Sequence, residues 1–209
     1  MESKFVITIG REFGSGGREI GEMVAAQLGI DFYDKKLIEI ASQKSGINKE
    51  LFENADESKS YSLIGSLFGL RTAPANEVPS GYFLSNETLF KIQSDVIREI
   101  ASEKSALFVG RCADYLLQDY NLCINIFITA SQEDKIERVC ARSEVLPDKA
   151  TALIEKMDKK RAAYYNYFSN KKWADIHSYD LCINSSLLGI KGTSNLIVQL
   201  VNELLHSCG

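Results

Sequence analysis

The sequence lacks the features that mark a secreted, disulfide-bonded or membrane-spanning protein. Its five cysteines are scattered along 209 residues and include no C-x-x-C pair, so neither a disulfide framework nor a zinc site is expected. No apolar run approaches the length of a membrane span, and no charged-then-apolar leader precedes the first apolar segment. We therefore expect a cytoplasmic protein with reduced thiols and no membrane partner.

Basic residues are not in excess either. The chain has 24 Lys and Arg against 28 Asp and Glu, a net charge of -4, which argues against nucleic acid as the main partner. Its two histidines, His177 and His206, lack neighbours at metal or catalytic-triad spacing, so no metal-ligating residue is predicted. The remaining composition is typical of a soluble globular domain.

Short apolar runs alternate with segments of helical periodicity along most of the chain, which predicts an α/β fold with a mostly parallel sheet covered on both faces. Asp34 is placed to cap the helix that follows the second run. Residues 45–85 differ, because they are polar and hold two of the three prolines, and we expect a helical insertion there. The expected strands are residues 5–9, 30–33, 106–109, 122–128 and 181–183.

A glycine-dense loop follows the first expected strand. Residues 10–21 read GREFGSGGREIG and lead into a periodic helix. Glycines let the backbone approach a ligand closely, and the free N–H groups at a helix start favour an anion. The loop therefore predicts phosphate binding, with a tight turn that needs glycine only for packing as the alternative.

The loop does not match the P-loop pattern G-x-x-x-x-G-K-[ST]. With Gly16 as its second glycine, the lysine position holds Gly17 and the hydroxyl position holds Arg18. Arg11 or Arg18 could supply the missing cation, since a guanidinium group suits phosphate. A dinucleotide-binding fingerprint fails because its third glycine would fall on Glu19.

Together these segments resemble the cytidylate kinase-like family, a branch of the P-loop nucleoside-monophosphate kinases. The matching segments occur in family order and span nearly the whole chain: residues 7–18, 32–38, 109–116, 126–130, 158–165 and 179–184. The resemblance implies a P-loop NTPase three-layer sandwich with about five parallel strands in a single domain, residues 1–209. Residues 45–85 would form the monophosphate-binding lobe and residues 145–170 the helical lid.

The resemblance also assigns roles to residues. It implies ATP and Mg²⁺ as cofactors and a small-molecule nucleotide as partner, and it leaves the oligomeric state open. Arg18, Arg111 and Arg161 would be catalytic, because phosphoryl transfer needs several cations around the transferred group. Substrate binding would fall to Asp34, Arg111, Asp114 and Arg142. The cofactor-binding loop would comprise Gly14, Ser15, Gly16, Gly17, Arg18 and Glu19.

Two departures from the family pattern leave the activity open. The loop lacks the P-loop lysine and hydroxyl, and Gly110, Arg111 and Cys112 stand where cytidylate kinases carry Gly-Arg-Asp. Asp34 could be an acceptor-site acid or a plain helix cap. We expect a nucleoside-monophosphate kinase-like phosphotransferase acting on CMP, dCMP or a related small phosphate acceptor. The alternative is a non-catalytic nucleotide-binding or regulatory protein on the same fold. The tyrosines of residues 164–168 could stack on a base, although packing is their more common role.

Overall fold

The computed structural model describes residues 4–50 and 86–207. Most of the insertion expected at residues 45–85 lies outside the described residues. Two compact units make up the chain, residues 1–34 with 97–209, and residues 35–96. None of the helices in the described ranges combines the length and apolar character that crossing a bilayer requires.

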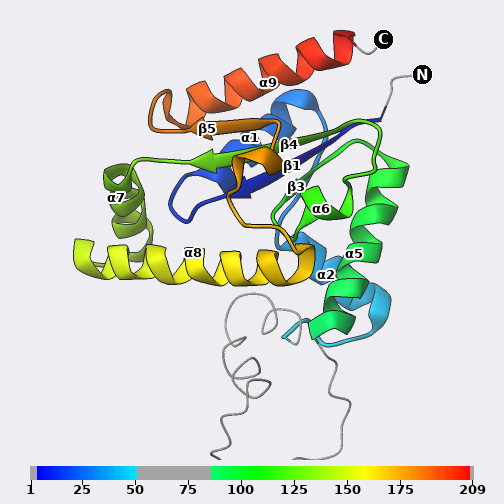
Figure 1. The fold of residues 1–209 in the computed structure, drawn as a ribbon, viewed down its shortest axis with the longest axis horizontal. Coiled ribbons are helices and arrows are strands. Elements are labelled where there is room, and N and C mark those ends of the chain that lie inside the picture. Colours follow the sequence, from blue (N-terminus) through cyan, green and yellow to red (C-terminus); the bar gives the residue numbers. More distant parts are fainter. Residues whose placement is uncertain (1–3, 51–85, 208–209) are drawn as a thin grey trace, which may run out of the picture. The chain divides into compact units, whose positions relative to one another are not determined.

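The strands and helices alternate as the sequence predicts (Figure 1). The strands are β1 (Val6–Arg11), β2 (Asp31–Tyr33), β3 (Ala106–Val109), β4 (Cys123–Thr129) and β5 (Leu181–Asn184). The helices are α1 (Gly17–Leu28), α2 (Lys36–Ser45), α5 (Asn86–Glu103), α6 (Ala113–Leu116), α7 (Gln132–Ser143), α8 (Pro147–Ser169) and α9 (Gly189–Ser207), with a short 3₁₀ turn η2 (Ile176–Ser178).

All five strands run parallel in one sheet, in the order β2-β3-β1-β4-β5. The central strand β1 pairs Ile7 with Leu107 on one side and with Ile124 on the other. Strand β1 extends two residues beyond the end of its apolar run, so it ends on Gly10 and Arg11. The carboxyl ends of β1 and its neighbour β3 therefore lie side by side, where open α/β sheets bind their ligands.

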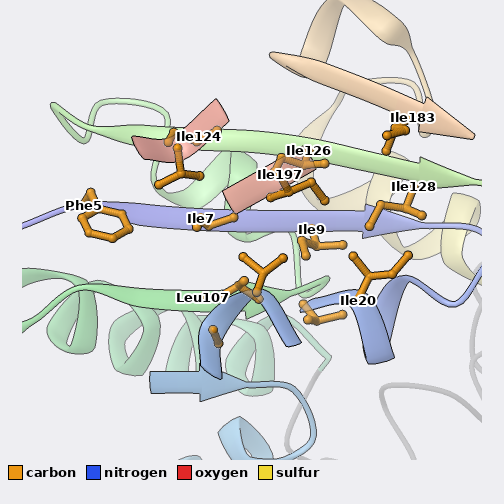
Figure 2. Packing of buried hydrophobic residues seen from close by; sticks show 14 residues of the cluster. Phe5, Ile7, Ile9, Ile20, Leu107, Ile124, Ile126, Ile128, Ile183 and Ile197 are labelled. Carbon is orange, nitrogen blue, oxygen red and sulfur yellow. The ribbon is translucent and has the colours of Figure 1, made fainter. Parts of the chain in front are cut away.

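One face of the sheet carries the main apolar core. Alternate residues of β1 point to this face because successive strand side chains point to opposite sides, and Ile7 and Ile9 lie beside Leu107 and Ile126 of the flanking strands (Figure 2). Helices α1 and α9 cover this face and pack against each other. The core thus fixes α1, and with it the loop that enters α1, against the end of β1.

The other face of the sheet carries aromatic rings, and α8 lies on this side (Figure 1). Phe127 of β4 contacts Tyr179 and Trp173, with ring centroids 5.0 and 5.6 Å apart. A Cβ added to Gly10 would lie 2.8 Å from Phe127 and 3.0 Å from the Tyr179 hydroxyl oxygen. Gly10 is therefore required by the packing of these rings against β1.

The expected helix cap at Asp34 is wrong. Helix α2 has Lys35 as its N-cap residue, without a capping side-chain hydrogen bond. The Asp34 carboxylate instead accepts a hydrogen bond of 2.9 Å from Nε of Arg18, on α1. A charged hydrogen bond to a guanidinium group competes well with a cap bond, because ionised partners form the stronger interaction.

Candidate functional site

The loop between β1 and α1 turns through two glycines in the left-handed region. Gly14 has φ +82° and Gly16 has φ +78°. A Cβ at Gly14 would lie 2.9 Å from the Lys135 backbone oxygen, and one at Gly16 would lie 2.1 Å from Ile190. Both glycines thus serve the tight turn and the packing of α7 and α9 against it. The same turn leads directly into the start of α1, and the backbone N–H groups at a helix start favour an anion.

Ser15 holds the loop together from inside. Its buried hydroxyl donates to the Glu12 carbonyl at 2.9 Å and accepts from the Gly17 amide at 3.3 Å. Its own carbonyl accepts a 2.7 Å bond from the Ser185 hydroxyl, which follows β5. Since the Ser15 hydroxyl is committed within the protein, its role is to shape the loop.

Glu12 joins the loop to β4 and α7. Its Oε2 accepts hydrogen bonds from the Thr129 hydroxyl at 2.5 Å and from Lys135 Nζ at 3.0 Å. Lys135 is buried, so this ion pair is shielded from solvent and from salt. The pair fixes the loop relative to the end of β4.

Arg142, predicted to bind substrate, and Arg161, predicted to be catalytic, both reach the loop at Phe13. Their Cζ atoms lie 4.7 and 5.4 Å from the centre of the Phe13 ring. The Phe13 amide donates to Asp158 Oδ1 at 2.7 Å, and Arg161 Nη1 donates to the Arg11 carbonyl at 3.1 Å. Helices α7 and α8 therefore hold the loop by its aromatic residue and by its backbone.

Asp158, which contacts Phe13 and Arg161, has a perturbed pKa. Its pKa is raised to about 6, chiefly by burial and also by the negative charge of Glu12, while the Phe13 amide, Arg161 and Lys135 oppose the rise. The neutral form is thus favoured relative to an exposed aspartate. Sequence reasoning did not single out Asp158, although this residue lies within the predicted lid, residues 145–170.

The Arg11 side chain packs against two glycines, Gly17 and Gly110. A Cβ at Gly17 would lie 2.7 Å from Arg11 Cβ and 3.2 Å from its Cγ, so the Arg11 stem crosses Gly17. A Cβ at Gly110 would lie only 2.1 Å from Arg11 Nη1, so the guanidinium group lies against Gly110. The Arg11 side chain therefore runs from the start of α1 to the end of β3.

Arg111 follows β3 in a strained turn. Gly110, Arg111 and Cys112 have φ values of +74°, +62° and +55°, and the left-handed region costs about 1–2 kcal/mol for a residue with a side chain. The Arg111 side chain is buried, which lowers its pKa to about 10; the positive charge of Arg11 lowers it too, whereas Tyr164 and Asp34 raise it. Strain and a buried charge at the ligand edge of the sheet favour a functional role.

Cys112 does not replace the aspartate that cytidylate kinases have at this position. Its thiol is buried, and burial together with the negative charge of Asp114 raises its pKa, although Arg111 opposes the rise. A neutral thiol therefore stands where the family carries a negative charge.

One carboxylate oxygen of Asp114 is already engaged by a tyrosine. Its Oδ2 accepts a 2.5 Å hydrogen bond from the Tyr165 hydroxyl, and burial raises its pKa. Tyr165 in turn is hydrogen-bonded to Tyr179, next to the aromatic face of the sheet. Neighbouring Tyr164 and Tyr167 pack their rings on Phe168 at 4.7 and 4.9 Å, so ring packing accounts for part of the tyrosine run.

Arg18 lies at the exposed start of α1. Its side chain is 61% exposed and pairs with Asp34 at 2.9 Å and Glu22 at 3.1 Å. Glu19, beside it, is also exposed. Two carboxylates thus neutralise the cation that the sequence predicts as catalytic, while Asp34 also lies close enough to Arg111 to raise its pKa.

The described residues do not offer a ligand set for Mg²⁺. In residues 4–50 and 86–207 no group of three or more His, Cys, Asp or Glu side chains could hold a metal ion. The Ser15 hydroxyl and the Glu12 carboxylate are hydrogen-bonded within the loop. The loop therefore does not fit a metal held chiefly by protein side chains, although Mg²⁺ can be bound largely through phosphates and water.

The sequence profile of the cytidylate kinase-like family matches residues 6–187. Comparison with curated proteins gave no match. Among solved structures, an uncharacterized protein from Eubacterium ventriosum is 26% identical, with a TM-score of 0.71 over 95% of this chain and 99% of the other.

Shikimate kinases share the fold at lower identity. The enzyme from Bacteroides thetaiotaomicron is 14% identical, with a TM-score of 0.53 over 98% of this chain and 99% of the other. The enzyme from Acinetobacter baumannii, in complex with shikimate, is 15% identical, with a TM-score of 0.50 over 99% and 95%. With the strand order, these matches confirm the predicted fold, a P-loop kinase-like α/β fold with a parallel sheet.

Proposed function

This chain belongs to the cytidylate kinase-like family, and from that premise we propose that it is an ATP-dependent phosphotransferase acting on CMP, dCMP or a related small phosphate acceptor. One observation carries the proposal. Arg11 ends β1, and Arg111 lies in the turn that follows the neighbouring parallel strand β3; the two are close enough for the charge of Arg11 to lower the pKa of Arg111. Adjacent cations at a ligand-binding edge are stabilised by an anion between or beside them.

The donor nucleotide belongs at the glycine loop. Residues 14–17 turn into the start of α1, where backbone amides and the positive end of the helix dipole favour phosphate. The loop is held from β4, β5, α7 and α8 by side-chain hydrogen bonds. Such a fixed loop can stabilise charge on a phosphate without rearranging during the reaction. Glu19, on the exposed side of α1, lies at the edge of this donor site.

The acceptor phosphate belongs at Arg111. Arg111 follows β3 at the edge of the sheet where open α/β folds bind their ligands, and a planar guanidinium group can bind two phosphate oxygens at once. The Asp34 carboxylate accepts a hydrogen bond from Arg18 and lies close enough to Arg111 to raise its pKa. In this proposal Asp34 orients the acceptor. Asp114 and Arg142 are second contacts for the acceptor in this proposal.

Magnesium enters this proposal with ATP. When bound, it would supply positive charge at the donor phosphates. Every other contribution comes from the chain. The loop amides bind the donor phosphates, Arg111 orients the acceptor, and Arg161 fixes the backbone at Arg11 by donating a hydrogen bond to the Arg11 carbonyl.

A second function is favoured by two specific positions. Gly17 stands at the P-loop lysine position and a neutral Cys112 thiol at the family's acid position. Loss of both groups would suit a protein that binds nucleotides without transferring a phosphoryl group, because charge stabilisation is the main requirement of the transfer.

A coupled assay of ADP release separates the two functions. Full-length protein with ATP and Mg²⁺ is tested against a panel of ribo- and deoxyribonucleoside monophosphates, with a no-acceptor control. ADP formation that depends on one monophosphate would support the phosphotransferase and identify its acceptor. ATP binding by calorimetry with ADP formation at the no-acceptor rate throughout would contradict it and favour the binding protein.

A further inference from the structure

We propose that Arg11 acts as the catalytic cation that contacts the transferring γ-phosphoryl group, in place of the P-loop lysine. The inference rests on the proposed function, since it assigns a role within that reaction. It moves the cation role from Arg18 to the last residue of β1.

The first argument is position. Gly17 stands where a P-loop has its lysine, and the Arg11 stem lies within 2.7 Å of the point where a Gly17 side chain would begin. A side chain at residue 17 and the present Arg11 therefore compete for the same space. The sequence has glycine at the lysine position because an arginine from the preceding strand fills it.

The second argument is reach. The guanidinium group of Arg11 ends against Gly110, with Nη1 2.1 Å from where a Cβ would stand. Gly110 immediately precedes Arg111, the residue proposed to bind the phosphate of the acceptor. A cation that begins at the donor loop and ends at the acceptor turn lies along the line that a transferred phosphoryl group follows.

The third argument is rigidity. Arg11 is still part of β1, paired with Ile128 of β4. Its carbonyl accepts the hydrogen bond from Arg161 Nη1 at 3.1 Å. A cation fixed on the central strand is placed before the substrates arrive, which is what electrostatic stabilisation of a transition state requires.

Arg18, the other arginine available to the loop, is committed elsewhere. Asp34 and Glu22 bind it at 2.9 and 3.1 Å, and its Cζ lies 5.7 Å from the Phe32 ring centre. Its charge is largely balanced by the two carboxylates and screened by solvent. Arg18 thus positions Asp34 rather than the γ-phosphoryl group.

The reaction step that Arg11 would stabilise is balanced without a further reactant. A deprotonated phosphate oxygen of the monophosphate forms a bond to the γ-phosphorus while the bond from that phosphorus to the β–γ bridging oxygen breaks. ADP leaves with the electron pair of the broken bond. Negative charge shifts onto the bridging oxygen, and a guanidinium group along this line stabilises it.

The test compares Arg11→Gln, Arg11→Lys and Arg18→Gln with wild type, and uses Arg98→Gln, at an exposed position of α5, as the matched arginine control. Isothermal titration gives the Kd of ATP and of ADP for each folded protein. We expect Arg11→Gln to weaken ATP binding about tenfold more than ADP binding, because only ATP carries the γ-phosphate. Where an acceptor is turned over, kcat should fall about 100- to 1,000-fold. Arg11→Lys should recover part of both losses.

Other results overturn the assignment. Equal weakening of ATP and ADP in Arg11→Gln, or a larger selective loss in Arg18→Gln, would show that Arg11 does not meet the γ-phosphate. The ratio of the two Kd values decides this even if wild type transfers to no acceptor, in which case the proposed function fails separately. Binding of neither nucleotide to wild type would contradict both. Melting temperatures show whether each variant folds; if Arg11→Gln does not, the ATP-to-ADP ratio in Arg11→Lys decides in its place.

Discussion

Two glycine–arginine pairs lie at the carboxyl ends of neighbouring strands, Gly10-Arg11 as the last residues of β1 and Gly110-Arg111 directly after β3, and they are built differently. Arg11 keeps strand geometry and pairs with β4, whereas Gly110, Arg111 and Cys112 are all left-handed. The first pair is held by side chains from other elements, and the second stores strain in its own backbone. The same dipeptide thus yields a fixed cation on the donor side and a buried, strained one on the acceptor side.

The pairs meet through Arg11, whose guanidinium group lies on Gly110. Gly110→Ala should therefore produce the largest effect, at least about 100-fold in kcat, because displacing a positioned group by an ångström has that order of cost. The added methyl group meets the end of a flexible side chain, so the protein should fold while Arg11 moves. Steady-state kinetics and a melting curve measure the two consequences.

Gly29→Ala is the matched glycine for this change. Gly29 has a similar φ of +65° but lies at the far end of α1 from the loop, with open space around an added Cβ, so we expect lost stability from backbone strain without a selective loss of kcat. If both variants lost stability equally and kept kcat, the contact between the two pairs would have no role in activity.

Arg111→Lys comes next. A lysine keeps the charge but loses the planar fork that binds two phosphate oxygens, so kcat/KM for the acceptor should fall about 10- to 100-fold. The KM for ATP should change less than about threefold, because Arg111 lies at the second pair. An equal change in both constants would mean that the two pairs do not divide the substrates.

Asp158 acts on the first pair alone, through the Phe13 amide and Arg161. Its folded pKa of about 6 is above the ordinary value of 3.8. The folded state therefore binds a proton more tightly than the unfolded state, and the associated stability is present below pH 4 and is lost as the pH rises to 6. Asp158→Asn should remove this decline, about 1–2 kcal/mol in the free energy of unfolding.

Denaturant titrations of wild type and Asp158→Asn at pH 4.5 and pH 7 measure the difference. Glu12 and Lys135 also face Asp158, and both remain in the variant. Parallel pH dependences in the two proteins would assign the perturbed titration to another group.

Glu22→Gln should have the smallest effect. Glu22 pairs with Arg18 across one turn of α1, and both side chains are more than half exposed. Such pairs contribute about 0.5 kcal/mol or less. Unfolding curves at low and high salt should differ little between variant and wild type, and a change above 1 kcal/mol would place Arg18 in a tighter network than its exposure indicates.

The sheet and the glycine loop could be predicted from the sequence because their signals are local. Runs such as Ala106–Val109 carry a strand pattern on their own, and the glycine-dense loop leads into helix α1 as the periodicity after it predicts. The resemblance to the family predicts the P-loop kinase-like fold, and the comparisons confirm the family and the fold. The helical insertion stays a prediction, because residues 51–85 are outside the described part of the chain.

The site could be predicted less well than the fold, because its contacts join residues that are far apart in the sequence. The Arg11 path depends on Gly17 and on Gly110, and nothing in the loop alone reveals the second. Asp34 has the signature of a helix cap locally, and only the fold brings it to Arg18. The left-handed conformation of Arg111 is also invisible to residue preferences, which favour glycine there. One signal was available, since Gly10-Arg11 repeats the dipeptide of Gly110-Arg111.

Crossed binding measurements test the division between the two pairs most directly. The Kd values of ATP and of CMP are measured for wild type, Arg11→Gln and Arg111→Gln. Arg11→Gln should weaken ATP binding and leave CMP binding within about threefold, and Arg111→Gln should do the reverse, each loss being about tenfold or more. Weakening of the same ligand by both variants would contradict the assignment of one pair to the donor and the other to the acceptor.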